Sequence, residues 1–113
     1  MDDRLEKLRR LTESEPDDAL ARFLLGREAS SLDLHEEARD AFAAAVAIDP
    51  HYTAAYRHWG NALEALGAYA EAAAVYARGV RVAESSRDLQ AGKEMAAFLK
   101  RLERDRGVQP PGE

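Results

Sequence analysis

Residues 22–29 read RFLLGREA, and 34 positions later residues 56–63 read YRHWGNAL. Both stretches place a large apolar residue directly before a glycine, at Leu25-Gly26 and at Trp59-Gly60. The same offset of 34 residues relates three further pairs around these stretches: Pro16 with Pro50, Ala38 with Ala72, and Phe42 with Tyr76. Repetition at one fixed spacing of this length is typical of repeat proteins, in which one small unit stacks on the next.

The repeat extends beyond these two units at the N-terminal side and fades at the C-terminal side. The same offset pairs Leu8 with Phe42 and Leu11 with Ala45, which indicates the second half of an earlier unit. Beyond Glu84 the sequence reads as one long amphipathic helix. We therefore predict one domain over residues 1–106, divided into a half-unit (1–16), repeat 1 (17–50), repeat 2 (51–84) and a C-terminal capping helix (86–106), with a disordered tail over 107–113.

The composition predicts an all-α protein. Ala, Leu, Glu, Arg and Lys supply 64 of the 113 residues, and all five are strong helix formers. Val, Ile and Thr together number 8, which is too few to build a sheet. The chain has no cysteine, so disulfides and thiolate metal sites are excluded.

Local start and stop signals divide the chain into six predicted helices. Asp17 and Asp18 place acceptors at a helix start, Gly67 suits a left-handed helix end, and Ser86 is a suitable N-cap for the last helix. Pro16 and Pro50 each follow a predicted helix end. The predicted helices cover residues 3–13, 17–31, 35–48, 52–66, 69–83 and 86–106.

The residues of the second unit carry a family resemblance. Tyr56-x-x-Trp59-Gly60-x-x-Leu63 followed by Ala72-x-x-x-Tyr76 resembles the tetratricopeptide repeat (TPR) family, in its small bacterial form. The resemblance covers about residues 4–106. It implies a right-handed superhelix (solenoid) of about six helices, arranged as antiparallel pairs.

Steric arguments assign these repeat residues to packing. Gly26 and Gly60 lack the side chain that would keep paired helices apart, and we expect Ala38 and Ala72 to face them. We expect the aromatic residues at positions 42 and 76 to fill the space between one helix pair and the next. The single tryptophan, at position 59, is predicted to be a core residue.

The sequence carries no recognisable catalytic or metal-binding constellation. No nucleophile elbow, zinc-protease motif or phosphate-binding glycine loop occurs, and the three histidines (His35, His51 and His58) have no third ligand at a suitable spacing. We therefore predict no enzyme activity, no metal and no cofactor. A pI of about 5.2 and a net charge of −5 argue against nucleic acid, and the short apolar runs argue against a membrane span. A cytoplasmic location is expected.

The predicted function lies in a groove. In a solenoid of helix pairs the first helix of each pair lines the concave side, which has the width of a peptide or a helix. The predicted groove residues are Leu20, Phe23, Arg27, Ser30, Arg57, Asn61, Glu64, Met95 and Phe98. One apolar residue, Phe23, and the two cations Arg27 and Arg57 suit an acidic and partly apolar segment of another protein. In the alternative interpretation, Phe23 packs against the first helix and both arginines are merely solvated.

Two functional hypotheses follow. The first is a non-enzymatic scaffold or adaptor that binds a peptide or helix of a partner protein in the groove. The second is homodimerisation through the terminal helix, where Ala91, Met95, Phe98 and Leu102 form an apolar stripe. If part of that stripe is exposed, it would pair with a second copy of the chain.

Overall fold

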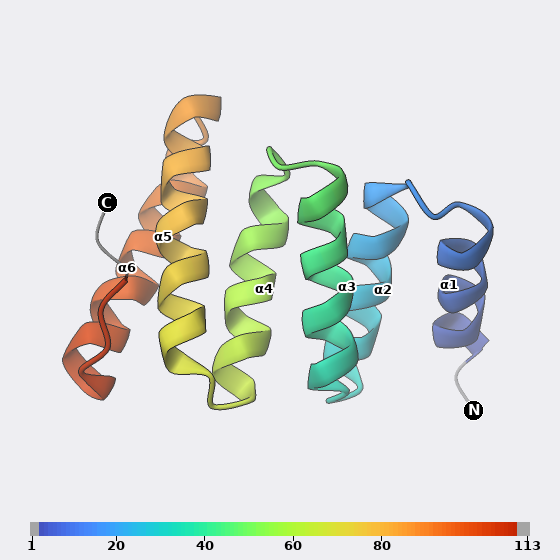
Figure 1. Ribbon diagram of the computed structural model, residues 1–113, viewed down its shortest axis with the longest axis horizontal. Helices are drawn as coiled ribbons and strands as arrows, with labels where there is room; N and C mark the ends of the chain where they lie inside the picture. Colours follow the sequence, from blue (N-terminus) through green and yellow to red (C-terminus); the bar gives the residue numbers. More distant parts are fainter. Residues whose placement is uncertain (1–2, 111–113) are drawn as a thin grey trace.

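The computed structural model describes residues 3–110, and six helices joined by short turns make up nearly all of them (Figure 1). The helices are α1 (Asp3–Ser14), α2 (Ala19–Ser31), α3 (His35–Ile48), α4 (Thr53–Ala65), α5 (Tyr69–Ser86) and α6 (Leu89–Arg106). No strand occurs between residues 3 and 110, so the predicted all-α class is confirmed. Four of the six helices begin and end within two residues of their predicted bounds. The other two differ by three residues, because α5 runs three residues further than predicted and α6 begins three residues later.

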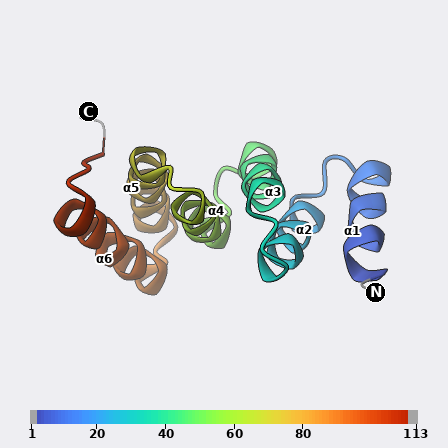
Figure 2. The same ribbon diagram turned by 90° about the horizontal axis from the view of Figure 1, so that it is seen from below.

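The helices follow one another along the longest axis of a molecule that measures 40 × 28 × 21 Å. In Figure 2, α2, α4 and α6 form one row and α3 and α5 a second row. The first helix, α1, lies at one end of the molecule and α6 at the other (Figure 1). This arrangement is the predicted solenoid of antiparallel helix pairs, in which each helix contacts mainly the helices next to it in the chain, with smaller contacts of α2 with α4 and of α4 with α6.

The turn between α2 and α3 and the turn between α4 and α5 share the same backbone conformation and the same hydrogen bonds. Asp33 and Gly67, 34 residues apart, both adopt a left-handed backbone, with φ values of 60° and 76°. The N–H of the next residue, Leu34 or Ala68, donates to the carbonyl five residues back, at 2.9 and 2.8 Å. This pattern satisfies the last carbonyls of each first helix, and it confirms the helix end predicted at Gly67.

The start of α6 differs from the prediction. Ser86 does not cap this helix, because α5 continues through Ser86 and ends only where Arg87 adopts a left-handed φ of 59°. Asp88 caps α6 instead, and its carboxylate accepts a hydrogen bond from the Ala91 N–H at 3.2 Å. Residues 84–86 contain neither glycine nor proline, so nothing in the sequence stops α5 earlier.

The two repeat glycines support aromatic rings. A Cβ added to Gly26 would lie 2.6 Å from the ring of Phe42, and one added to Gly60 would overlap the ring of Tyr76. The glycines therefore face the rings of their own helix pair rather than Ala38 and Ala72, which corrects the prediction. The rings also reach the next pair, as predicted, since Phe42 stacks on a histidine of α4 and Tyr76 contacts a phenylalanine of α6.

Trp59 is not the fully buried core residue that the repeat predicts. Its equivalent, Leu25, is buried, whereas the larger indole of Trp59 is half-buried and extends from the core to the surface. There it lines a hollow together with Val75 and Arg78 of α5. The physical reason is size, because the space that holds the leucine of the first repeat does not enclose a whole indole.

The chain leaves α6 at Gly107, which has a left-handed φ of 67°. The next residue, Val108, is half-buried and packs against the core. The tail predicted to be disordered, residues 107–113, therefore begins with a residue that packs against the domain. Residues 111–113 of that tail, and residues 1–2 of the predicted half-unit, lie outside the described part of the chain.

Candidate functional site

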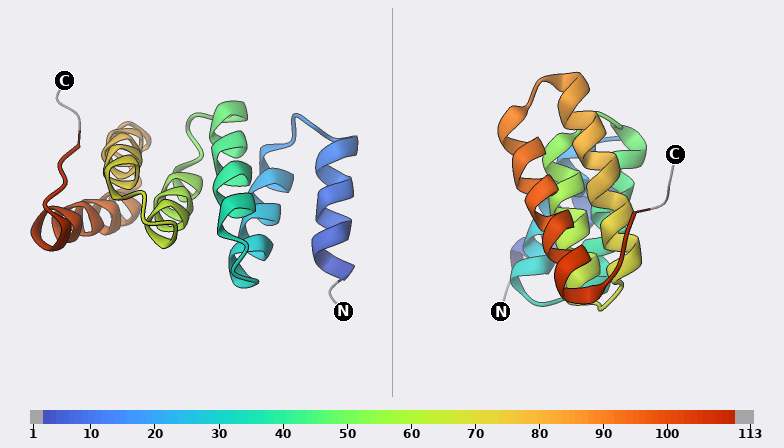
Figure 3. Two further views of the ribbon diagram at one scale, coloured as in Figure 1. Left: turned by 60° about the horizontal axis from the view of Figure 1, so that its bottom comes forward. Right: turned by 90° about the vertical axis from the view of Figure 1, so that its left-hand side faces the viewer.

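The predicted groove corresponds to the surface of α2, α4 and α6, which we call the groove face. These three helices are neighbours in the solenoid (Figures 2 and 3). The second helices of the pairs, α3 and α5, pack behind them and contribute side chains from below. Most of the predicted site residues lie on this face, although not all of them reach its surface.

An aromatic cluster forms the floor of the groove face between α2 and α4. Phe23 lies at its centre and is only 8% exposed. Its ring centroid lies 5.7 Å from that of Phe42, 4.9 Å from that of Tyr52 and 5.3 Å from that of His58. Of the two interpretations of Phe23, packing is correct, but the packing partners are α3 and α4 rather than the first helix.

His58 is a member of this cluster that the sequence prediction left out of the site. Its ring stacks on that of Phe42, with centroids 5.5 Å apart and planes 25° from parallel. Burial, followed by the positive charges of Arg57 and Arg27, lowers the pKa of His58 to about 4, so the imidazole is neutral at pH 7. His58 lies three residues before Asn61 on α4, so helical periodicity places it on the same face as this predicted groove residue. This spacing is the sequence signal that could have identified His58.

Two ion pairs tie α4 to α6 across the groove face. The Arg57 guanidinium lies 3.8 Å from the Glu94 carboxylate, and Arg101 donates to Glu64 at 2.6 Å. Arg57 and Glu64 are seven residues apart on α4, and Glu94 and Arg101 are seven residues apart on α6. The two ion pairs therefore lie two helical turns apart along the same contact between α4 and α6. Glu94 and Arg101 were missed because a contact between α4 and α6 leaves no local pattern in the sequence.

Tyr76 supports the groove face from below. Its hydroxyl group lies 2.6 Å from the Asn61 Oδ1 and 2.5 Å from a Glu64 carboxylate oxygen, so its single proton can be donated to either of these two acceptors. Burial, and then the hydrogen bond to Glu64, raises the pKa of Tyr76 well above its usual range. The tyrosine therefore stays protonated and holds Asn61 and Glu64 in place.

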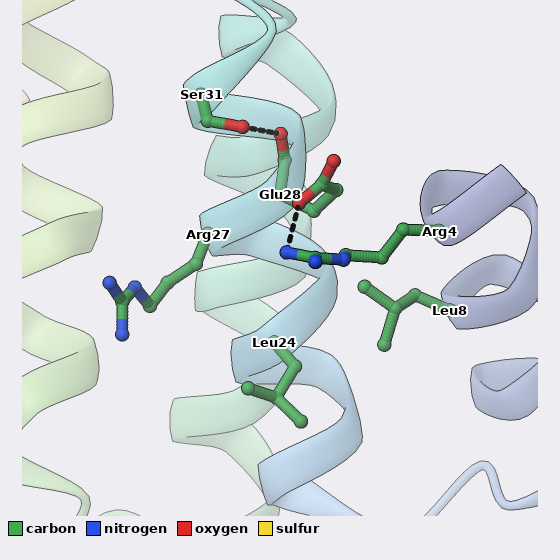
Figure 4. Close-up of a pocket in the computed structure, with 6 residues that line it drawn as sticks. All are labelled: Arg4, Leu8, Leu24, Arg27, Glu28 and Ser31. Atoms are coloured by element: carbon green, nitrogen blue, oxygen red, sulfur yellow. Dashed lines mark hydrogen bonds and ion pairs between the residues drawn. The ribbon is translucent and has the colours of Figure 1, made fainter. Parts of the chain in front are cut away.

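Arg27 is the one predicted site cation whose guanidinium has no recorded hydrogen bond or ion pair to any residue in the range 3–110. It is exposed, and Figure 4 shows its guanidinium pointing away from Arg4 and Leu8 of α1. Ser30, one helical turn further along α2, is half-buried. Leu20, one turn before Phe23, is 55% exposed.

The two predicted site residues on α6 differ in accessibility. Met95 is fully buried beneath the backbone of Gly79, so its assignment to the groove surface is wrong. The apolar stripe that includes Met95 and Leu102 faces the core, because α6 packs against α5 through it. Phe98 is half-buried, 5.4 Å from the Tyr76 ring, and Arg101 covers its face at 5.2 Å.

Within residues 3–110, no group of three histidine, aspartate or glutamate side chains converges closely enough to hold a metal ion. None of the six helices in this range combines the length and the apolar character that crossing a membrane requires.

Relatives of the chain identify its family. The TPR repeat-containing protein PA0015 of Pseudomonas aeruginosa is 34% identical over 102 residues, which is 90% of this chain and 97% of that protein. This chain belongs to the TPR family. No protein-family model matches the TPR sequence described here.

Two solved structures resemble this TPR protein along most of its length. Protein BPP2914 of Bordetella parapertussis aligns with a TM-score of 0.78 and 31% identity, over 93% of this chain and 91% of that one. A tetratricopeptide repeat domain protein of Salinibacter ruber aligns with a TM-score of 0.73 and 26% identity, over 87% of this chain and 96% of that one. The family assignment makes the protein a protein-protein interaction module.

Proposed function

We propose that this TPR protein is a non-enzymatic adaptor that binds a peptide or helix of another protein along the groove face. The bound segment carries an acidic side chain that pairs with Arg27. The main support is that Arg27 is exposed on the groove face and makes no hydrogen bond or ion pair with another residue in the range 3–110.

The surroundings of Arg27 favour an anion. Arg57 lies on the neighbouring helix, and its guanidinium makes two long contacts, 3.8 Å to the Glu94 carboxylate and 3.4 Å to His58 Nε2, so a partner carboxylate competes with weak interactions there. The imidazole of His58 is neutral at pH 7 and half-buried, and it offers a partly apolar surface near both arginines. A carboxylate bound by a guanidinium in such a place gains charge-assisted hydrogen bonds.

Apolar contacts are available at both ends of the groove face. Leu20 is 55% exposed on α2, and Phe98 is half-exposed on α6. Glu64 and Asn61 lie between them and are already held by Tyr76, so they present fixed hydrogen-bonding groups to a bound backbone. Because the groove face spans only three helices, we expect micromolar affinity, about −8 kcal/mol.

The test is the double variant Arg27→Glu with Arg57→Glu. Tagged wild-type protein is used to capture partners from lysate, the partners are identified by mass spectrometry, and a segment that binds is then titrated as a synthetic peptide. The reversed charges are expected to weaken binding of that peptide at least about tenfold.

The matched control is Arg10→Glu with Arg81→Glu, which changes the net charge equally on α1 and α5, outside the groove face. The control is expected to bind as the wild type does. Equal binding by the groove variant and the wild type would show that partners are recognised elsewhere on the protein.

A further inference from the structure

Each end of the described chain displays an incomplete helix pair. Leu8 of α1 occupies the repeat position of Phe42 and Tyr76, so α1 is the second helix of a pair whose first helix is not among residues 3–110. At the other end, α6 lies in the row of the first helices α2 and α4, and no second helix follows it within the described residues (Figure 2).

At the α1 end, this incompleteness leaves a hollow between α1 and α2. It measures about 500 Å³ and is lined by Arg4, Leu8, Leu24, Arg27, Glu28 and Ser31, and we call it the N-terminal hollow. Figure 4 shows Leu8 and Leu24 reaching into the space between the two helices, beside the ion pair of Arg4 with Glu28.

The intact repeat shows what kind of element fits this hollow. Leu8 and Leu24 are the equivalents, 34 residues earlier, of Phe42 and His58. The ring of Phe23, a side chain of the first helix α2, packs against both of them, with its centroid 5.7 Å from that of Phe42 and 5.3 Å from that of His58. A first helix docked beside α1 would in the same way place an apolar side chain against both Leu8 and Leu24.

At the α6 end, a second hollow of about 260 Å³ lies between α5 and α6. Its lining includes the charged residues Glu84, Asp88 and Lys93 besides Val80, Leu89 and Gly92, and we call it the C-terminal hollow. Leu89 is 72% exposed, the largest value among the exposed large apolar residues. A Cβ on Gly92 would touch only Ala83, at 3.4 Å, so the surface beside this glycine is open where Gly26 and Gly60 are covered by rings.

We propose that copies of this protein assemble head to tail, with α6 of one copy in the N-terminal hollow of the next. The same contact places α1 of the second copy against the C-terminal hollow of the first. Within residues 3–110, α6 is a first helix with no second helix after it, and α1 is a second helix with no first helix before it, so each copy supplies a pairing helix to the other. One contact fills both hollows and completes a third helix pair.

The charges of the two ends are complementary. Residues 2–18 carry four basic and seven acidic groups, a net charge of −3, and residues 87–106 carry six basic and four acidic groups, a net charge of +2. Opposite net charges favour contact between unlike ends and oppose contact between like ends. The occupant that fits both hollows is therefore a second copy in the head-to-tail orientation, rather than a symmetric dimer through α6.

A head-to-tail contact leaves one hollow of each kind open at the ends of the assembly. Unless the rotation between copies closes a ring, the assembly grows with concentration into dimers, trimers and longer series. Sedimentation velocity of the wild-type protein over a range of concentrations is expected to show this growth, and added salt is expected to reduce it.

Two variants that each block one end provide the decisive test. Leu24→Lys places a positive charge in the N-terminal hollow, which would face the positively charged α6 end of another copy. Leu89→Glu places a negative charge in the C-terminal hollow, which would face the negatively charged α1 end of another copy. Leu24 is 39% and Leu89 72% exposed, so both changes are compatible with folding. Each variant alone is expected to self-associate at least about tenfold more weakly than the wild type.

Mixing the two variants is expected to restore association, because each retains the end that the other has lost. The mixture stops at a 1:1 dimer, since both remaining ends are blocked. Leu66→Glu, at a similarly exposed leucine in the turn after α4, is the matched control and is expected to associate as the wild type does. Circular dichroism melts establish that all three variants are folded.

Three results would overturn the proposal. One is a wild-type protein that stays monomeric up to about millimolar concentration, far above the range of specific contacts. Another is a Leu24→Lys variant that dimerises as well as the wild type, which is the outcome for a symmetric contact through α6. The third is a pair of folded, non-associating variants that fail to associate when mixed.

Discussion

At the scale of single residues, glycine has two different roles in this protein. The ring of Tyr76 covers Gly60 where a Cβ would stand, and the hydroxyl of that ring is fixed by Asn61 and Glu64. The ring is therefore held at both ends and has little freedom to move. By contrast, Gly92 of α6 has space for a methyl group.

This contrast predicts opposite effects of the same substitution. Gly60→Ala is expected to lower the free energy of unfolding by about 2 kcal/mol, because overpacking outweighs the gain in helix propensity. Gly92→Ala is expected to raise it by about 0.5–1 kcal/mol, the usual gain for alanine in a helix. Urea denaturation measures both, and equal effects at the two positions would show that the Tyr76 ring moves aside freely.

His58 makes the stability of the domain depend on pH. Its pKa in the folded protein is about 4, below its ordinary value of 6.5, because the ring is buried beside Arg57 and Arg27. The unfolded chain therefore takes up the proton at a higher pH than the folded chain does. The resulting stability is fully present above pH 6.5 and is lost as the pH falls from 6.5 to 4.

The variant His58→Leu isolates this effect, since the equivalent residue in the first repeat is Leu24. The wild type is expected to lose about 2 kcal/mol more than the variant between pH 6.5 and pH 4, as measured by urea denaturation at each pH. Carboxylates titrate in both proteins and cancel in the comparison. His51→Gln, at an exposed histidine, is the control, and it is expected to keep the wild-type pH dependence.

At the scale of elements, most helices could be predicted because their signals are local. The left-handed turn at Gly67 and the acceptor at Asp18 act within a few residues, and the structure contains both. The end of α5 could not be predicted in the same way. Arg87 adopts the left-handed conformation without being a glycine, so its backbone is set by the packing of α5 on α6 rather than by residue type.

The site was harder to predict than the helices, because its surface depends on contacts between elements. The periodicity of α6 places Met95 and Phe98 on one apolar stripe, but it does not tell which side of that stripe α5 covers. The structure buries Met95 and leaves Phe98 half-exposed. In the same way, the pairing of Arg101 with Glu64 joins residues 37 positions apart and follows only from the stacking of first helices.

At the scale of the whole molecule, the solenoid has two kinds of helix. α2, α3, α4 and α5 pack between neighbours on both sides, whereas α1 and α6 end the described stack. α1 is held mainly by α2 and by the two-point pairing of Arg9 with Glu37 of α3, at 2.8 and 2.7 Å. In a solenoid whose helices contact mainly their neighbours, the ends open more readily than the middle.

Head-to-tail assembly predicts that this difference depends on protein concentration. Amides of α1 and α6 are expected to exchange hydrogen faster than those of α3 and α4 in dilute solution. When the free protein reaches about ten times the dissociation constant, exchange at both ends slows about tenfold, because a second copy covers them. Hydrogen exchange at two concentrations measures the effect. Leu89→Glu is expected to remove it, and a slowing confined to α6 would instead indicate that like ends pair.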